Sequence, residues 1–232
     1  MLIDLRTLKP NPMRDFVIDP MDDDAVGRLK TSIEEDGFWG GVVCRRTDDG
    51  GFQIGAGHHR VKAAIAAGIE TADLYVADLD DAAMVRVYAR ENATQRGNTG
   101  TAQAGSVASA IRFIAKASLG GVLGEICQND ADKVRGNIAS DRGLGWSVVV
   151  DFLAGVPGIN ESTVKQALAN LKASGDYARI IGEVKDEIDR ENREALEALK
   201  KAEEEQRIAE ERSRKAEEER KAAAARDRKS VV

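Results

Sequence analysis

The first residues of the chain alternate apolar and polar positions and then change to a helical spacing. Residues 2–8 alternate, which predicts an opening strand, and the two prolines of residues 9–15 then interrupt regular structure. The acidic residues 22–24 can cap a helix that ends at Gly37. The apolar face of this helix consists of Val26, Leu29 and Ile33.

A hairpin and a second helix are expected next. Residues 41–46 read as a strand and residues 51–54 as its partner, with the Gly-containing turn TDDGG between them. An alanine-rich helix over 60–67 is closed by Gly68, because glycine readily takes the left-handed conformation that ends a helix.

One more strand and one more helix complete this part of the chain. Residues 72–79 predict a strand, and Asp80 or Asp81 can open a helix that runs through Arg96. The first ninety-odd residues are therefore predicted to form a small α+β domain, with bounds 1–98.

From Thr101 onward the pattern is helical. Residues 102–119 predict one helix, whereas 124–145 are ambiguous, with a short helix and a loop as one interpretation. A short helix that ends near Ala154, the turn GVPGIN and a helix capped by Asn160 then give a helix-turn-helix pattern. The apolar face of its second helix holds Val164, Ala167, Leu168 and Leu171. We expect an all-α domain over 99–180.

The last segment, 181–232, is rich in Glu, Arg, Lys and Ala and has many favourable Glu-to-basic pairs four residues apart. One apolar heptad column is present, but its partner column is polar, whereas a robust coiled coil needs both. We predict a long solvated helix with a marginal capacity for self-association. The apolar column consists of Ile181, Ile188, Ala195, Ala202, Ala209 and Ala216.

Composition narrows the class of protein. The net charge is −6, whereas nucleic-acid-binding proteins are more often basic. The charge is unevenly distributed, because residues 1–96 hold 12 basic and 17 acidic residues, whereas residues 97–175 hold 7 basic and 6 acidic residues. Any DNA contact is therefore expected in the middle segment. The distant Cys44 and Cys127 fit neither a disulfide framework nor a metal site and are expected to be small buried residues. A cytoplasmic protein without a signal peptide or membrane span is the expectation.

The segment GAGHHR, Gly55 to Arg60, lies between a strand and a helix and holds both histidines of the chain. Its glycines allow a tight turn, and the helix start and Arg60 favour an anion such as phosphate. A purely structural turn is the alternative. Adjacent His58 and His59 would point about 100° apart on a helix, so joint chelation of a metal is disfavoured. A Ser-His-Asp or Cys-His catalytic arrangement has no support in the nearby sequence.

A second candidate is ENATQR, Glu91 to Arg96. Glu91 and Asn92 offer the hard oxygen donors that Mg²⁺ accepts, and Gln95 and Arg96 follow one helical turn later. A solvated polar helix end is the alternative.

Four segments, in this order and spacing, resemble the N-terminal domain of the ParB partition family and its phage and plasmid relatives. They are LKPNPMRD, SIEEDGFWGGVVCRR, GAGHHRVKAAIAAG and ARENATQRGN. The resemblance implies an α+β fold of the ParB/sulfiredoxin-like type, followed by a helix-turn-helix domain. It also implies a homodimer that closes around DNA when a nucleoside triphosphate, CTP in the first place, binds with Mg²⁺. Any hydrolysis would be slow.

The resemblance also implies roles for individual residues. The nucleotide would be bound by the matching positions of the two boxes and of the loop near the base, and Glu91 and Asn92 would also hold the metal. These positions are Gly55, Gly57, His58, His59, Arg60, Glu91, Asn92, Gln95, Arg96, Gly40 and Gly41.

Two departures from the family pattern affect this assignment. GHHR replaces GERR, which removes a fixed positive charge, and Gly40-Gly41 replaces the frequent Gln-Pro of the base loop. His58 occupies the position of the catalytic cysteine of the related sulfiredoxins, so their chemistry is not expected. The sequence also offers no carboxylate cluster for a two-metal nuclease.

The second helix of the helix-turn-helix would read DNA in the major groove. Its outward candidates are Lys165, Gln166, Asn170 and Lys172. An ordinary helical hairpin is the structural alternative. The sequence thus favours a nucleotide-switched DNA-binding protein in partition or transcriptional regulation. The other hypotheses are a DNA-binding regulator that has lost its nucleotide and a small-molecule kinase or nuclease on the same fold.

Overall fold

The computed structural model describes residues 1–95, 99–119 and 144–229, without the side chains of Gln95 and 216–229. The ambiguous helix within 124–145 and Cys127 fall mainly or wholly outside the described residues. The chain divides into two compact units, Met1–Lys185 and Asp186–Val232.

Two small sheets form the N-terminal part of the first unit. β1 (Leu2–Asp4) pairs antiparallel with β4 (Thr71–Asp73), with Ile3 opposite Ala72. β2 (Val43–Arg46) forms the predicted hairpin with β3 (Phe52–Ala56), and β5 (Tyr75–Val76) adds to β2 in parallel. Cys44 in β2 is fully buried, as expected for a small apolar residue, and burial raises the pKa of its thiol to about 11.

Two sequence predictions for strands need correction. The opening strand covers only Leu2–Asp4, because the chain then turns into the short 3₁₀ helix η1 (Leu5–Thr7), capped by the Asp4 side chain. The strand predicted over 72–79 is divided between the two sheets. The division lies at Leu74, whose N–H donates to the Met1 carbonyl while Tyr75 and Val76 pair with β2.

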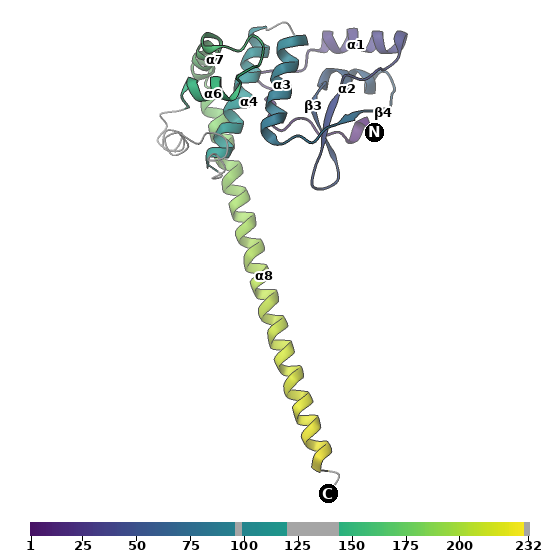
Figure 1. Cartoon of the computed structure of the whole chain (residues 1–232), viewed down its shortest axis with the longest axis vertical. Helices are drawn as coiled ribbons and strands as arrows, with labels where there is room; N and C mark the ends of the chain where they lie inside the picture. The colour runs from purple at the N-terminus through teal and green to yellow at the C-terminus, as the bar shows by residue number, and fades with distance from the viewer. Residues whose placement is uncertain (96–98, 120–143, 230–232) are drawn as a thin grey trace. The chain divides into compact units, whose positions relative to one another are not determined.

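Helices α1 (Asp23–Asp36) and α2 (His58–Ala66) pack against each other beside these sheets (Figure 1). The predicted cap of α1 is confirmed for Asp22, whose carboxylate accepts from the Ala25 N–H at 3.0 Å. Helix α2 begins two residues earlier than expected, because Gly57 adopts a left-handed conformation and lets the helix start at His58. Ile3, Val26, Ile33 and Ile54 lie in the common core.

The helical segment of the first unit is built on α3 (Asp81–Gln95) and α4 (Gly100–Leu119), which lie side by side (Figure 1). Against α4 pack α6 (Trp146–Phe152) and α7 (Glu161–Ser174). The Asn160 cap is confirmed, since its side chain accepts from the Thr163 N–H at 3.0 Å, and Gly175 ends α7 in a left-handed conformation. α6 ends at Phe152, two residues before the predicted end.

The final helix, α8 (Asp176–Lys229), starts directly after Gly175, five residues earlier than the change of composition suggested. Its first turns belong to the compact unit, where Ile180 and Val184 are fully buried. The long C-terminal helix is thus confirmed. The separation of 1–98, 99–180 and 181–232 as domains stays a prediction.

A partly buried loop, residues 11–19, connects the α+β part to the helices. Ser109 of α4 donates to the Met13 carbonyl at 2.8 Å, and Asp15 accepts from Arg112 of α4 and Arg179 of α8 at 3.4 and 2.8 Å. Tyr88 of α3 donates a short hydrogen bond to Asp19. These contacts fix the loop against three helices.

Candidate functional site

A cleft of about 780 Å³ lies where three helices begin. Pro20, Met21, Asp22 and Ala25 belong to the start of α1, His59 and Arg60 to the start of α2, and Thr99 and Thr101 to the start of α4. Arg28 and Leu29 of α1 and Glu91 of α3 complete the lining. The N-terminal ends of helices carry partial positive charge and unpaired N–H groups, so their convergence favours an anionic ligand.

Gly57 holds the turn that starts α2. Its φ is +95°, and a Cβ there would lie 2.9 Å from Val42 Cγ2 and 3.0 Å from the Gly41 carbonyl oxygen. The Gly57 N–H donates to Glu91 Oε1 at 2.9 Å. The two sequence motifs, GAGHHR and ENATQR, are therefore joined directly by this hydrogen bond.

Arg60 connects the cleft to a second, smaller pocket of about 260 Å³. Its guanidinium donates to the Gly41 carbonyl at 2.8 Å. A Cβ on Gly41, whose φ is +76°, would lie 2.9 Å from Arg60 Nη1, so this approach requires glycine. Both Arg60 and Leu29 line both pockets, which makes them neighbours.

The smaller pocket is mostly apolar. Trp39 is 83% exposed at its edge, and Gly40 and Gly41 both have positive φ. The remaining lining comes from Leu29, Ser32, Ile33, Gly37 and Phe38. An apolar pocket with an aromatic edge next to a cleft that favours anions offers separate places for a base and for phosphates.

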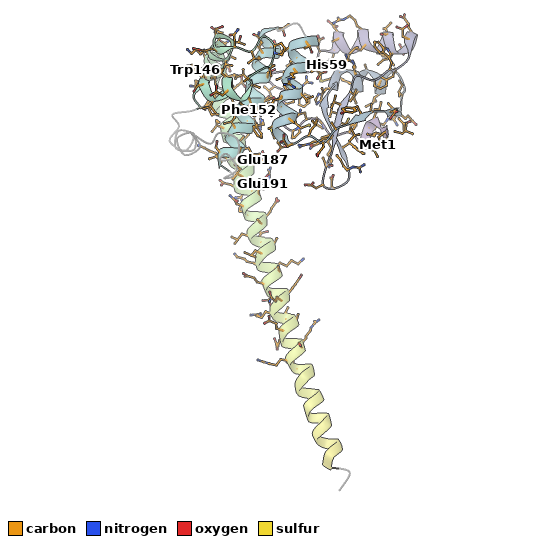
Figure 2. All side chains as sticks on the ribbon, in the orientation of Figure 1. Met1, His59, Trp146, Phe152, Glu187 and Glu191 are labelled. Carbon is orange, nitrogen blue, oxygen red and sulfur yellow. The ribbon has the colours of Figure 1, made fainter. Side chains whose placement is uncertain are left out.

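The two histidines have different environments. His58 is buried and its Nε2 accepts from the Asn11 N–H at 3.1 Å, while its Nδ1 has no hydrogen-bond partner among the described residues. Burial and the neighbouring charge of Arg14 lower the pKa of His58 to about 3, so the ring is neutral. His59, labelled in Figure 2, lines the cleft, and its Nε2 accepts from the Asp22 N–H at 3.1 Å.

Only part of the ENATQR motif lines the cleft. Glu91 lines it, whereas the buried Asn92 donates to the Ala102 carbonyl and to Ser106 Oγ of α4, both at 3.3 Å. Gln95 is the last residue of α3, and its side chain and all of Arg96 lie outside the described residues. Gly55 is part of β3, and its carbonyl accepts from the Asn11 side chain.

Metal binding has a limited set of candidate ligands. Within the described part of the chain, no group of three or more His, Cys, Asp or Glu side chains is placed to hold a metal ion. Mg²⁺ needs fewer protein ligands, since one or two carboxylates with substrate phosphates suffice. Glu91 fits that role, whereas the Asn92 side chain would first have to leave the α3–α4 interface.

The four candidate DNA-reading residues are exposed on α7, opposite its buried face. Lys165 lies 4.1 Å above the ring of Trp146 and pairs with Glu161. Gln166 donates to Asn170 at 2.9 Å, and Lys172 lies 5.4 Å from the Tyr177 ring. Figure 2 labels Trp146 at the start of α6. The exposed face of α7 is therefore polar and accessible, and each candidate side chain contacts a neighbouring side chain.

Sequence reasoning missed the polar cleft residues outside the motifs, which are Asp22, Arg28, Thr99 and Thr101. Asp22 was recognised only as a cap. Positions 22, 25, 28 and 29 follow helical spacing, so a stripe with the polar Asp22 and Arg28 beside Ala25 and Leu29 was detectable. Its direction toward the cleft was not.

Taken together, the fold and the cleft define a small α+β part with an anion-favouring site, followed by a helical segment that includes α6 and α7. Residues 1–93 match the family model described as the ParB N-terminal domain. This match covers the part of the chain in which the sequence resemblance was found.

Solved structures give a weaker likeness over more of the chain. One is the C-terminally truncated chromosome-partitioning protein ParB from Caulobacter crescentus with the centromeric parS site, at 19% identity and a TM-score of 0.40 over 75% of this chain and 78% of that one. Another is the same protein with CTP-gamma-S, at 19% identity and a TM-score of 0.31 over 72% and 98%. Among curated proteins, no sequence relative matches. None of the described helices is long and apolar enough to cross a bilayer.

Proposed function

We propose that this chain is a DNA-binding protein whose N-terminal domain binds a nucleoside triphosphate, with CTP as the first candidate and Mg²⁺ as its metal. The observation that carries the proposal is the cleft at the starts of α1, α2 and α4, which Arg60 and Glu91 of the two motifs both line. The match of residues 1–93 to the ParB N-terminal domain model supports the same ligand class.

Each group of residues has a role in this proposal. The phosphates would contact Arg60, His59 and the first N–H groups of α2, and Glu91 would hold Mg²⁺, which supplies positive charge against the phosphate oxygens. The base would enter the pocket beside Gly40 and Gly41. His58 would support the loop from within the core, through its bond with Asn11, instead of contacting the nucleotide.

The nucleotide would act on DNA binding through the partly buried loop 11–19. This loop contacts α2 through Asn11 and His58, and α4 and α8 through Asp15. A ligand that moves the start of α2 would therefore also shift the contacts that this loop makes with α4 and α8. Two such chains, closed by nucleotide, would form a clamp on DNA with α7 in the major groove, in partition or in transcriptional regulation.

The direct test is isothermal titration calorimetry of the full chain with CTP, ATP, GTP and UTP, with Mg²⁺, in the presence and absence of duplex DNA. Binding of at least one triphosphate is expected. Arg60→Ala should weaken it more than tenfold, because a charge-assisted hydrogen bond contributes about 1.5–3 kcal/mol. An unchanged affinity in this variant would place the phosphates elsewhere.

A DNA-binding regulator without a nucleotide is the second candidate, and one observation favours it. His58, inside the motif that should bind phosphate, is buried and neutral. If no triphosphate binds under any of these conditions while duplex DNA still binds, this second function replaces the first. Loss of DNA binding in Lys165→Ala would assign the contact to α7 in either case.

A further inference from the structure

Arg28 lies on the α1 wall of the cleft, outside every motif that pointed to nucleotide binding. The cap Asp22 and the α1 residues Ala25, Arg28 and Leu29 line the cleft. Arg28 and Leu29 follow Ala25 by three and four positions, which places these residues on one side of α1. The Arg28 side chain is exposed. A hydrogen bond from the Ala25 N–H is the main cause that lowers the pKa of Asp22, and the positive charge of Arg28 adds to it.

The charges around the cleft show why Arg28 matters. Of the lining side chains, Asp22 and Glu91 are acidic and Arg28 and Arg60 are basic. The guanidinium of Arg60 is also engaged with the Gly41 carbonyl at the edge of the smaller pocket. Without Arg28 the lining would carry more negative than positive charge, which would repel a polyphosphate.

We infer that Arg28 is a phosphate-binding residue of the cleft, so that a polyphosphate is held between cations from α1 and α2. This inference rests on the proposed nucleotide function and adds a residue to that site. Arg28 provides the fixed positive charge that His59 does not, and its five N–H donors suit phosphate oxygens. Its contribution should grow with the number of phosphates and should be small for a nucleoside.

The experiment measures binding of CTP, CDP, CMP, cytidine and inorganic tripolyphosphate to the full chain by calorimetry at fixed Mg²⁺ and salt. Four proteins are compared: wild type, Arg28→Ala, Arg28→Lys and Lys30→Ala. Lys30 pairs with Glu34 on α1, so its substitution removes the same charge from the same helix, away from the cleft lining. Thermal unfolding of each variant verifies that the fold is retained.

Arg28→Ala should bind CTP and tripolyphosphate at least tenfold more weakly, the loss should diminish from CTP to CMP, and Arg28→Lys should recover part of it. Lys30→Ala should remain within about twofold of wild type. If wild type binds CTP and Arg28→Ala binds it with equal affinity, the inference is overturned and the proposed function stays intact. If wild type binds tripolyphosphate but no nucleotide, the proposed function is overturned. In that case a tenfold loss of tripolyphosphate affinity in Arg28→Ala would still support phosphate binding by Arg28, and an unchanged affinity would overturn it.

Two outcomes remain. If wild type binds neither CTP nor tripolyphosphate, both the function and the inference fail. A duplex DNA titration distinguishes the other source of phosphate: a loss of DNA affinity in Arg28→Ala with unchanged tripolyphosphate binding would make Arg28 a DNA contact and would also overturn the inference.

Discussion

His58 should make the stability of this protein strongly dependent on pH. Burial, with a smaller effect of the Arg14 charge, lowers its pKa from the usual 6.5 to about 3. The Nε2 atom accepts a hydrogen bond from the Asn11 N–H, and a proton on that nitrogen would break it. The folded protein therefore favours the neutral ring, whereas the unfolded chain takes up a proton near pH 6.5.

The sign and size of the pH effect on stability follow from proton linkage. Because the pKa is lower in the folded state, the contribution of His58 to stability is fully present above pH 6.5 and is lost as the pH falls toward 3. Between pH 8 and pH 5 the unfolded state gains about 2 kcal/mol from protonation while the folded ring stays neutral. The folding equilibrium should shift by roughly 30-fold over this range.

Two measurements test this. Urea unfolding followed by tryptophan fluorescence at pH 5, 6, 7 and 8 should give the predicted loss in wild type. His58→Gln, which can still accept from Asn11 but does not titrate, should lose most of this pH dependence. His59→Gln is the matched control, since the chain has only these two histidines, and should retain it. A folded-state NMR titration midpoint of His58 above pH 6 would refute the reasoning.

Two further substitutions test particular contacts. Gly41→Ala should cost about 1–2 kcal/mol of stability because its φ is +76°, and it should also weaken nucleotide binding by displacing Arg60. Gly50→Ala is the control, because its φ is +81° and an added Cβ would meet no described atom within 4 Å. It should lose stability but keep its nucleotide affinity. Equal nucleotide affinity in the two variants would contradict the Arg60 contact. Asp15→Ala should lower the free energy of unfolding by about 1–3 kcal/mol, because it removes a buried acceptor from Arg112 and Arg179, which both keep Glu183 as a partner. Asp176→Ala, which removes a more exposed partner of Arg179, should cost under about 1 kcal/mol in the same urea experiment; equal losses would show that burial of Asp15 has no special weight.

Most elements could be predicted because their patterns are local. The caps at Asp22 and Asn160 and the hairpin of β2 and β3 depend on residues a few positions apart. The split of the strand over 72–79 could not be predicted, because it depends on pairing with Met1 and with β2, both distant in sequence. The start of α8 at Asp176 was missed because the change of composition, and not the helix end at Gly175, was taken as the boundary.

The sequence by itself determined the order of the elements, the resemblance of the N-terminal part to the ParB family and the two motifs that contribute residues to the cleft. It also determined that His58 and His59 point in different directions, because that follows from helix geometry. Only the tertiary structure decided which histidine enters the core, that Asn92 packs against α4, and that Arg28 lines the cleft. The physical reason is that helical spacing fixes the angles between side chains on one helix, whereas docking against the other elements fixes which of those faces reaches the site.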